Sequence, residues 1–197
     1  WEMGIEAIYP GPNLSRREQK KKIYPYLLEG VEINEPNYVW SSDITYIKLK
    51  SGFMYLVAVI DWFSRYILSW KLSNSLNADF CLETTENALN KTSRKPEIFN
   101  TDQGCQFTSD AFVKLIKSNG IKISMDGRGR ALDNIFIERV WRSLKYEEVY
   151  LKDYETVGEA KTGIDNYFDL YNNRRPHQSL ENKYPVEVHF GKKGESI

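Results

Sequence analysis

The chain has 197 residues, of which 41% are hydrophobic and 14% aromatic, enough for one main hydrophobic core with a small appendage. No apolar run approaches the roughly 20 residues of a membrane span and no signal peptide opens the chain, so we expect a soluble globular protein without a membrane partner. The 27 basic and 27 acidic residues balance, which excludes the strongly basic overall charge typical of nucleic-acid binders and leaves only local basic clusters.

Residues 1–34 show weak periodicity, with turn residues at 10–13 and a basic cluster at 16–22. We expect a small helical remnant and basic linker here, then a main domain at 35–190 with a C-terminal helical extension, and a tail at 191–197. The basic cluster is either a solvated helix end or a phosphate-binding linker. Because the chain begins at Trp1 rather than at a methionine, we expect it to be part of a longer protein.

Three runs rich in β-branched and aromatic residues follow, at 39–47, 53–60 and 65–70. Short turns at 50–52 and 61–64 connect them, which predicts an antiparallel meander. We interpret Asp61, in the second turn, as a turn-stabilising residue rather than a metal ligand. Two cysteines, Cys81 and Cys105, and two histidines cannot supply a spaced zinc set, so we expect free thiols in a reducing cytosol.

Helices and strands then alternate. Periodic apolar residues predict a helix at 78–89, a strand at 97–101, a helix from the N-cap Ser109 to 119–120, and a strand at 121–125. A glycine loop at 126–130 precedes a helix capped by Asp133 or Asn134, and a last helix covers 157–171. This order predicts an α/β fold, with a mixed five-stranded sheet flanked by helices in which the last two strands lie parallel to the first.

Three carboxylates occupy positions where chemistry is plausible. Asp43 lies within the first strand, Asp102 ends the fourth, and Glu138 lies early in a helix. Singly, each has an ordinary alternative: an outward edge residue, an Asx turn, and a solvated helix carboxylate. Parallel strands would bring Asp43 and Asp102 to one end of the sheet, where the helix of Glu138 can cross. Three hard oxygen ligands without thiolate or imidazole suit Mg²⁺ or Mn²⁺, and two such ions can clamp a phosphodiester displacement.

Several motifs resemble the OrfB-type bacterial insertion-sequence transposases of the IS three family. They are residues 3–10 (MGIEAIYP), 40–47 (WSSDITYI), 100–109 (NTDQGCQFTS), 132–138 (LDNIFIE) and 171–177 (YNNRRPH). Asp102 and Glu138 are separated by 35 residues, as in the DDE enzymes that include retroviral integrases. The resemblance implies an RNase H-like fold, with Asp43, Asp102 and Glu138 as the metal-binding catalytic triad. It also implies metal-dependent strand cleavage, then strand transfer by the released 3′-hydroxyl, in DNA transposition and integration.

Basic residues near these motifs are candidates for DNA contacts. Arg142 and Lys145 follow Glu138 by four and seven residues and share its helix face, where the alternative is a solvated ion pair. Further candidates, each with a structural alternative, are Arg128 and Arg130 in the glycine loop and Arg174 and Arg175 before Pro176. His177 is too isolated to be assigned as a metal ligand.

The resemblance implies DNA as the partner, both element ends and target, and a homo-oligomer assembled on DNA in the bacterial cytoplasm. We expect sequence-specific recognition to reside in an N-terminal part outside this chain. Two other functions stay open: an RNase H-like nuclease acting on RNA·DNA hybrids, and a non-catalytic DNA-binding regulator on the same fold.

Overall fold

The computed structural model describes residues 23–126 and 134–191. The basic cluster at 16–22, Asp133, and the loop arginines Arg128 and Arg130 lie outside the described residues. The described strands are β1 (Val39–Leu49), β2 (Gly52–Asp61), β3 (Ile67–Ser73), β4 (Ile98–Thr101) and β5 (Lys122–Met125). The described helices are α1 (Asp79–Lys91), α2 (Asp110–Ser118), α3 (Ile135–Leu144), η1 (Lys145–Val149), α4 (Tyr150–Lys152), α5 (Val157–Asn173), η2 (Gln178–Leu180) and α6 (Pro185–Phe190).

The five strands form one sheet in the order β3-β2-β1-β4-β5. β1, β2 and β3 pair antiparallel, whereas β4 pairs parallel with β1 and β5 pairs parallel with β4. The meander followed by two parallel strands confirms the predicted mixed sheet. Helices α1 and α2 supply the crossovers between the strands on the parallel side.

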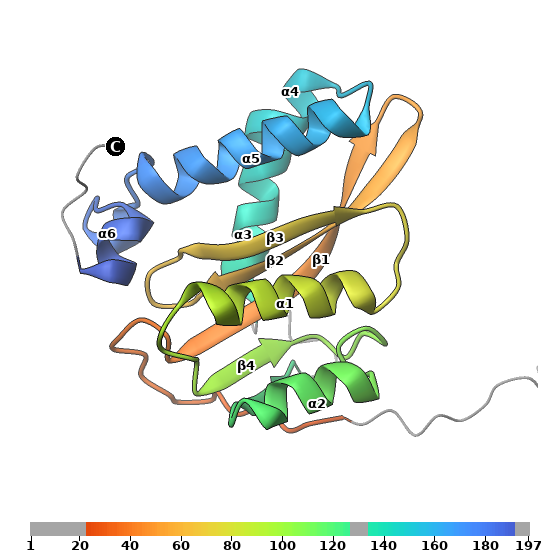
Figure 1. The fold of residues 1–197 in the computed structure, drawn as a ribbon. Coiled ribbons are helices and arrows are strands. Elements are labelled where there is room, and N and C mark those ends of the chain that lie inside the picture. The colour runs from red at the N-terminus through yellow and green to blue at the C-terminus, as the bar shows by residue number, and fades with distance from the viewer. Residues whose placement is uncertain (1–22, 127–133, 192–197) are drawn as a thin grey trace, which may run out of the picture.

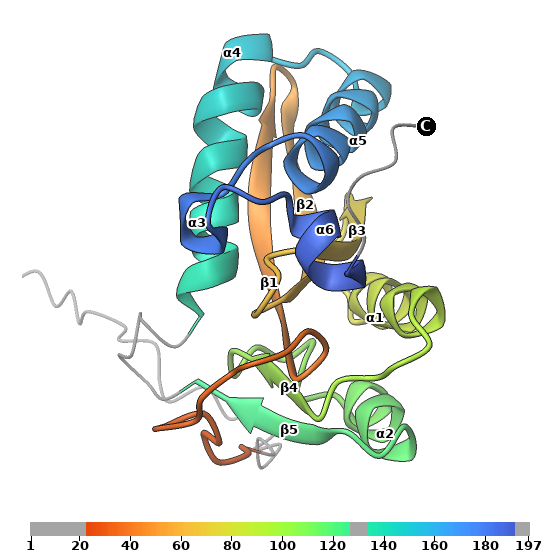
Figure 2. The same ribbon diagram turned by 90° about the vertical axis from the view of Figure 1, so that its left-hand side faces the viewer.

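Helices cover both faces of the sheet (Figure 1). α1 lies in front of the sheet in that view and α3 behind it, and the turned view of Figure 2 separates the two layers. Alternate residues of β1 supply the two cores: Val39 and Ile47 pack with α3 and α5, whereas Trp40 packs with α1 and α2. Because the period is two, the odd-numbered residues of β1, including Asp43, face the α3 side.

The helix ends largely follow the sequence signals. Ser109 caps α2 by accepting a hydrogen bond from the Phe112 amide at 3.3 Å, as predicted. Asn134 occupies the N-cap position of α3 without a side-chain capping bond. The helical segment that starts with α3 does not stop at Leu144 but continues through the π-helical turn η1 into α4. π-Helical turns are uncommon and recur at functional sites.

Residues 23–34, part of the predicted helical remnant and linker, contain no helix and pack on the main domain. Leu28 is buried in the α3 and α5 core, and Tyr24 packs against the other core. The Leu27 amide donates to the Ser124 hydroxyl of β5 at 3.0 Å. This part of the N-terminal segment therefore belongs to the same packed unit as the sheet.

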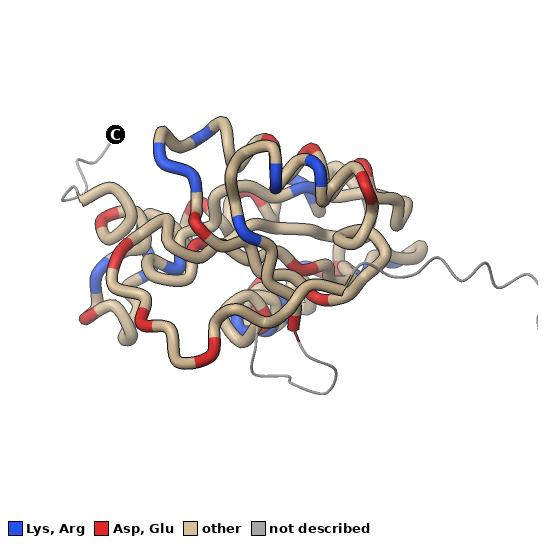
Figure 3. The backbone as a smooth tube through the Cα atoms, turned by 90° about the horizontal axis from the view of Figure 1, so that it is seen from below, with Lys and Arg blue, Asp and Glu red and all other residues tan. Residues whose placement is uncertain are grey.

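Charges of both signs are interspersed along the described backbone (Figure 3). No described helix is long and apolar enough to cross a bilayer. Among the described residues both cysteines are free, Cys81 buried and Cys105 exposed.

Candidate active site

The sheet register brings Asp43 and Asp102 to equivalent positions on neighbouring parallel strands. Ser41 of β1 pairs with Asn100 of β4, and each aspartate follows its strand's paired residue by two. Since side chains alternate, both carboxylates emerge on the face that carries Ser41 and Asn100, which is the α3 side. The predicted approach of these two aspartates at one end of the sheet is thus what the register produces.

Asp43 is largely buried and is held by α3. The indole Nε1 of Trp141 donates to Asp43 Oδ2 at 2.9 Å. The pKa of Asp43 is raised from its ordinary 3.8 to about 6. Burial is the largest cause, hydrogen bonds from the Ile44 amide and Trp141 act in the lowering direction, and the negative charges of Asp102 and Glu138 add to the rise. The three predicted carboxylates therefore share one electrostatic field. Trp141 was not singled out from sequence, because an aromatic residue at helical spacing indicates only a core position.

Asp102 lies just past β4, exposed, and forms the predicted Asx turn. Its Oδ1 accepts from the Gly104 amide at 2.8 Å, and a Cβ at Gly104 would lie 2.8 Å from that same oxygen. A side chain at position 104 would therefore force the Asp102 carboxylate to move from this orientation. A fourth carboxylate, Asp126, follows β5 at the same sheet edge and accepts from Asn100 Nδ2 at 2.7 Å.

Glu138 lies in the first turn of α3 with an exposed side chain. Arg142 and Lys145, four and seven residues later, share its helix face as predicted. Lys145 is half-buried beside the triad: burial lowers its pKa, and the Asp43 carboxylate acts in the opposite direction. Lys145 is also the first residue of the π-helical turn η1. The change from α-helix to π-helix therefore occurs at the residue whose charge interacts with Asp43.

The donor set suits a divalent cation. Asp43, Asp102 and Glu138 offer only hard carboxylate oxygens, and a cation between them would relieve the charge repulsion that disfavours ionised Asp43. Across residues 23–126 and 134–191, no three His, Cys, Asp or Glu side chains lie close enough to hold one ion between them. Metal binding would therefore have to draw the carboxylates together.

The two arginines of the 171–177 motif have intramolecular partners. Arg175 Nη2 donates to Glu147 Oε1 at 2.8 Å, and its Nη1 contacts Glu147 Oε2 and the Tyr167 hydroxyl. Arg174 is exposed and lies 3.6 Å from Asp169. His177 packs edge-on against Tyr171, with ring centroids 4.6 Å apart. These contacts favour the packing alternative for Arg175, whereas Arg174 keeps an exposed guanidinium.

Asp61 anchors the β2–β3 turn, as interpreted from sequence. Its Oδ1 accepts from the amide and the hydroxyl of Ser64 at 2.7 and 2.6 Å, and its Oδ2 accepts from the Asn37 amide at 2.7 Å. His189 Nδ1 of α6 lies 3.0 Å from the same hydroxyl. All three side chains of this Ser-His-Asp cluster are buried, and the serine proton is directed at the aspartate rather than the histidine. The cluster therefore holds α6 against the turn and is no hydrolase triad.

Comparison with known protein families agrees with this arrangement. An integrase core domain family matches residues 33–131, and a second integrase core domain family matches residues 119–185. The transposase for insertion sequence element IS904 of Lactococcus lactis is 33% identical over 179 residues, covering 90% of this chain and 68% of that protein. The chain belongs to the integrase core family of insertion-sequence transposases. The chain thus carries the integrase core of a DDE-type polynucleotidyl transferase.

Other members of the family extend the match. The transposase for IS629 of Shigella sonnei is 30% identical over 194 residues, covering 94% of this chain and 64% of that protein. Transposase InsF for insertion sequence IS3A of Escherichia coli is 31% identical over 144 residues, covering 72% and 50%. These relatives confirm the resemblance that the motifs indicated. This chain spans about half to two thirds of the length of the curated relatives it matches.

Solved structures show the same fold. The HTLV-2 integrase catalytic core domain in complex with magnesium superposes with a TM-score of 0.63 at 22% identity, covering 80% of this chain and 99% of that one. An integrase chain of a simian T-cell lymphotropic virus intasome gives 0.69 at 20% identity, covering 84% and 60%. The integrase core described here is therefore RNase H-like, as the resemblance implied.

Proposed function

We propose that Asp43, Asp102 and Glu138 are the catalytic triad of this transposase and hold two Mg²⁺ or Mn²⁺ ions. The observation that carries the proposal is the shared register of Asp43 and Asp102 beside α3, with Glu138 in the same electrostatic field. When bound, two such ions supply charge neutralisation at the attacking and leaving oxygens of a phosphodiester. The magnesium of the HTLV-2 integrase core supports the choice of a hard divalent cation.

The surrounding residues of this chain set the geometry of the carboxylates. Trp141 donates its indole N–H to Oδ2 of Asp43, and the Ile44 amide also donates to this carboxylate, so both hydrogen bonds orient it. The Gly104 amide fixes Asp102 in the same way. Lys145, whose charge already acts on Asp43, can hold a backbone phosphate beside the reacting one, and Arg142 extends this positive face of α3. Phosphoryl transfer depends on positioning and charge neutralisation, so this chemistry requires no protein nucleophile.

The reaction we propose is cleavage at the ends of an insertion sequence to release a 3′-hydroxyl, followed by attack of that hydroxyl on target DNA. Element ends and target DNA are then both substrates, and joining two ends favours a homo-oligomer assembled on DNA. The intasome of the simian virus supports assembly as the working state. Contacts from Arg174 and from the loop residues Arg128 and Arg130 remain predictions, as does a location in the bacterial cytoplasm.

The test uses the full-length protein and a labelled duplex that carries candidate element ends. With Mg²⁺ or Mn²⁺ we expect nicked and strand-joined products, and with EDTA none. Glu138→Gln should abolish both products without changing the unfolding midpoint, because Glu138 is exposed. Glu86→Gln, an exposed carboxylate of α1, is the matched control and should keep full activity.

Three results would contradict the proposal. Full activity of Glu138→Gln would remove Glu138 from the triad. Hydrolysis of an RNA·DNA hybrid without any strand transfer would support a nuclease instead. DNA binding without metal-dependent cleavage would support a non-catalytic regulator.

A further inference from the structure

A cleft of about 130 Å³ is lined by a different face of α3 from the one that carries Lys145, and it contains several positive charges. It is bounded by the β2–β3 turn, α3, α5 and the segment that joins α5 to α6. We call it the arginine cleft; its lining includes Arg65, Arg139, Ser143, Arg175 and Ser179. Three arginines thus come from three separate segments of the chain.

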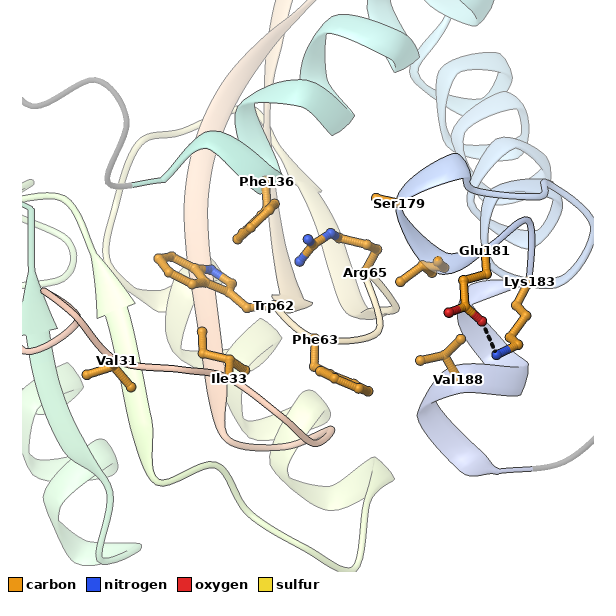
Figure 4. Close-up of a pocket in the computed structure, with 11 residues that line it drawn as sticks. Val31, Ile33, Trp62, Phe63, Arg65, Phe136, Ser179, Glu181, Lys183 and Val188 are labelled. Atoms are coloured by element: carbon orange, nitrogen blue, oxygen red, sulfur yellow. Dashed lines mark hydrogen bonds and ion pairs between the residues drawn. The ribbon is translucent and has the colours of Figure 1, made fainter.

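Arg65 is the central cation of the arginine cleft. Its guanidinium carbon lies 3.4 Å from the ring centroid of Phe136 on α3, and Figure 4 shows it directed at that ring. The pKa of Arg65 is lowered to about 10, chiefly by burial. Tyr171 and Asp61 act in the raising direction, and the charge of Arg139 contributes to the lowering. Arg65 therefore remains protonated at neutral pH in a site that disfavours its charge.

The positive charge of the cleft is only partly neutralised. Arg175 is paired with Glu147, and Lys183 in the adjoining pocket is paired with Glu181 (Figure 4). Within the part of the chain that the structure describes, the guanidinium groups of Arg65 and Arg139 form no ion pair and no hydrogen bond. The Asp61 carboxylate acts on Arg65 from a distance and is itself hydrogen-bonded to Asn37 and Ser64. Two neighbouring cations that form no ion pair are complementary to an anion, and arginine is suited to bind phosphate through two parallel bonds.

The backbone at Arg65 indicates that its side chain matters. Arg65 has a φ of 62°, in the left-handed region that residues other than glycine and asparagine rarely adopt. Such a conformation is unfavourable for a residue with a side chain and persists where the surroundings require it. The packing of the Arg65 guanidinium on Phe136 supplies such surroundings.

We propose that the arginine cleft binds a phosphate of the DNA backbone, and so fixes the register of the strand whose scissile phosphate lies at the carboxylates. This inference rests on the proposed function. Phe136, Arg139 and Ser143 line the cleft from one face of α3, and Glu138, Arg142 and Lys145 lie on the adjacent face.

A helix with its side chains is about 10 Å across, so two sites on different faces of α3 lie within reach of one DNA strand. The cleft would therefore take a phosphate of that strand within a few nucleotides of the scissile one. Ser143 and Ser179 line the cleft and can donate hydroxyl hydrogen bonds to the same phosphate.

The test measures DNA affinity against salt concentration for the full-length protein without metal, using a labelled duplex with candidate element ends. Arg139→Gln should lower the slope of log K against log salt by about one, the contribution of one phosphate contact. Lys114→Gln, an exposed lysine of α2 on the other face of the sheet, is the matched control and should leave the slope unchanged.

Position is tested with duplexes carrying one neutral methylphosphonate linkage. Wild type should lose affinity about tenfold at one linkage within a few nucleotides of the cleavage position. Arg139→Gln should lose little more affinity at that linkage. If wild type and Arg139→Gln have equal salt slopes, or lose the same affinity at every linkage, then the cleft does not bind a DNA phosphate. This conclusion would hold even if strand transfer were normal. If the slope and linkage effects are found but no strand transfer occurs, the proposed function is wrong and phosphate binding in the cleft is still supported. Failure to bind DNA at all would overturn both.

Discussion

Ionising Asp43 in the folded chain costs free energy, so the stability of the metal-free protein should fall as the pH rises. Its pKa rises from 3.8 to about 6 on folding, chiefly through burial. This contribution to the free energy of unfolding is fully present below about pH 4 and is lost as the pH rises through about 6, because the folded chain binds the proton more tightly. The shift corresponds to about 3 kcal/mol. Asp43→Asn, which cannot ionise, should therefore be more stable than wild type at pH 8 by up to about 3 kcal/mol.

Urea unfolding in EDTA at pH 4 and pH 8 measures this difference. The stability advantage of Asp43→Asn should be near zero at pH 4 and largest at pH 8, whereas Asp165→Asn, an exposed aspartate of α5, should show no such pH dependence. Adding Mg²⁺ at pH 8 should stabilise wild type and leave Asp43→Asn unaffected, since only the folded wild-type site binds the ion. An advantage of the same size at both pH values would refute the assignment of the cost to the ionised carboxylate.

Two further substitutions test other parts of the structure. Lys145→Ala should reduce the salt slope of DNA binding by about one and change the unfolding midpoint little. A slope equal to that of wild type would show that Lys145 makes no phosphate contact. Gly163→Ala should destabilise the protein by about 1–3 kcal/mol, because the new Cβ would collide with the Tyr154 hydroxyl and lie 2.7 Å from Glu148 Oε1. Gly158→Ala, in the same helix with its nearest contact at 3.9 Å, should be neutral or gain up to about 1 kcal/mol, and equal effects of the two glycine substitutions in urea unfolding would contradict the collision.

Local sequence patterns were sufficient for the elements that position the candidate site. A run of β-branched and aromatic residues predicted β1, and the cap at Ser109 predicted the start of α2, because both signals arise from local backbone and side-chain geometry. The helical crossovers then predicted that β4 lies parallel to β1. From that topology alone, Asp43 and Asp102 were expected at one end of the sheet, which the register confirms.

The identity of the three carboxylates as a set came from the ordered motifs, not from periodicity. Each of the three has an ordinary local role, and Asp102 does form the Asx turn that was its alternative. The π-helical turn after Leu144 was not predicted, because local sequence patterns do not distinguish a π-helical turn from a continuing α-helix.

The sequence by itself determined the order and type of the main elements, and which residues form the motifs of an integrase core. Only the tertiary structure decided the contacts between distant segments. Trp141 meets Asp43 across 98 residues, and Arg175 pairs with Glu147 across 28. The arginine cleft likewise combines Arg65 with a helix that begins 70 residues later. Such pairs leave no periodic signal, because they depend on how α3 and α5 pack on one face of the sheet rather than on the local conformation of either segment.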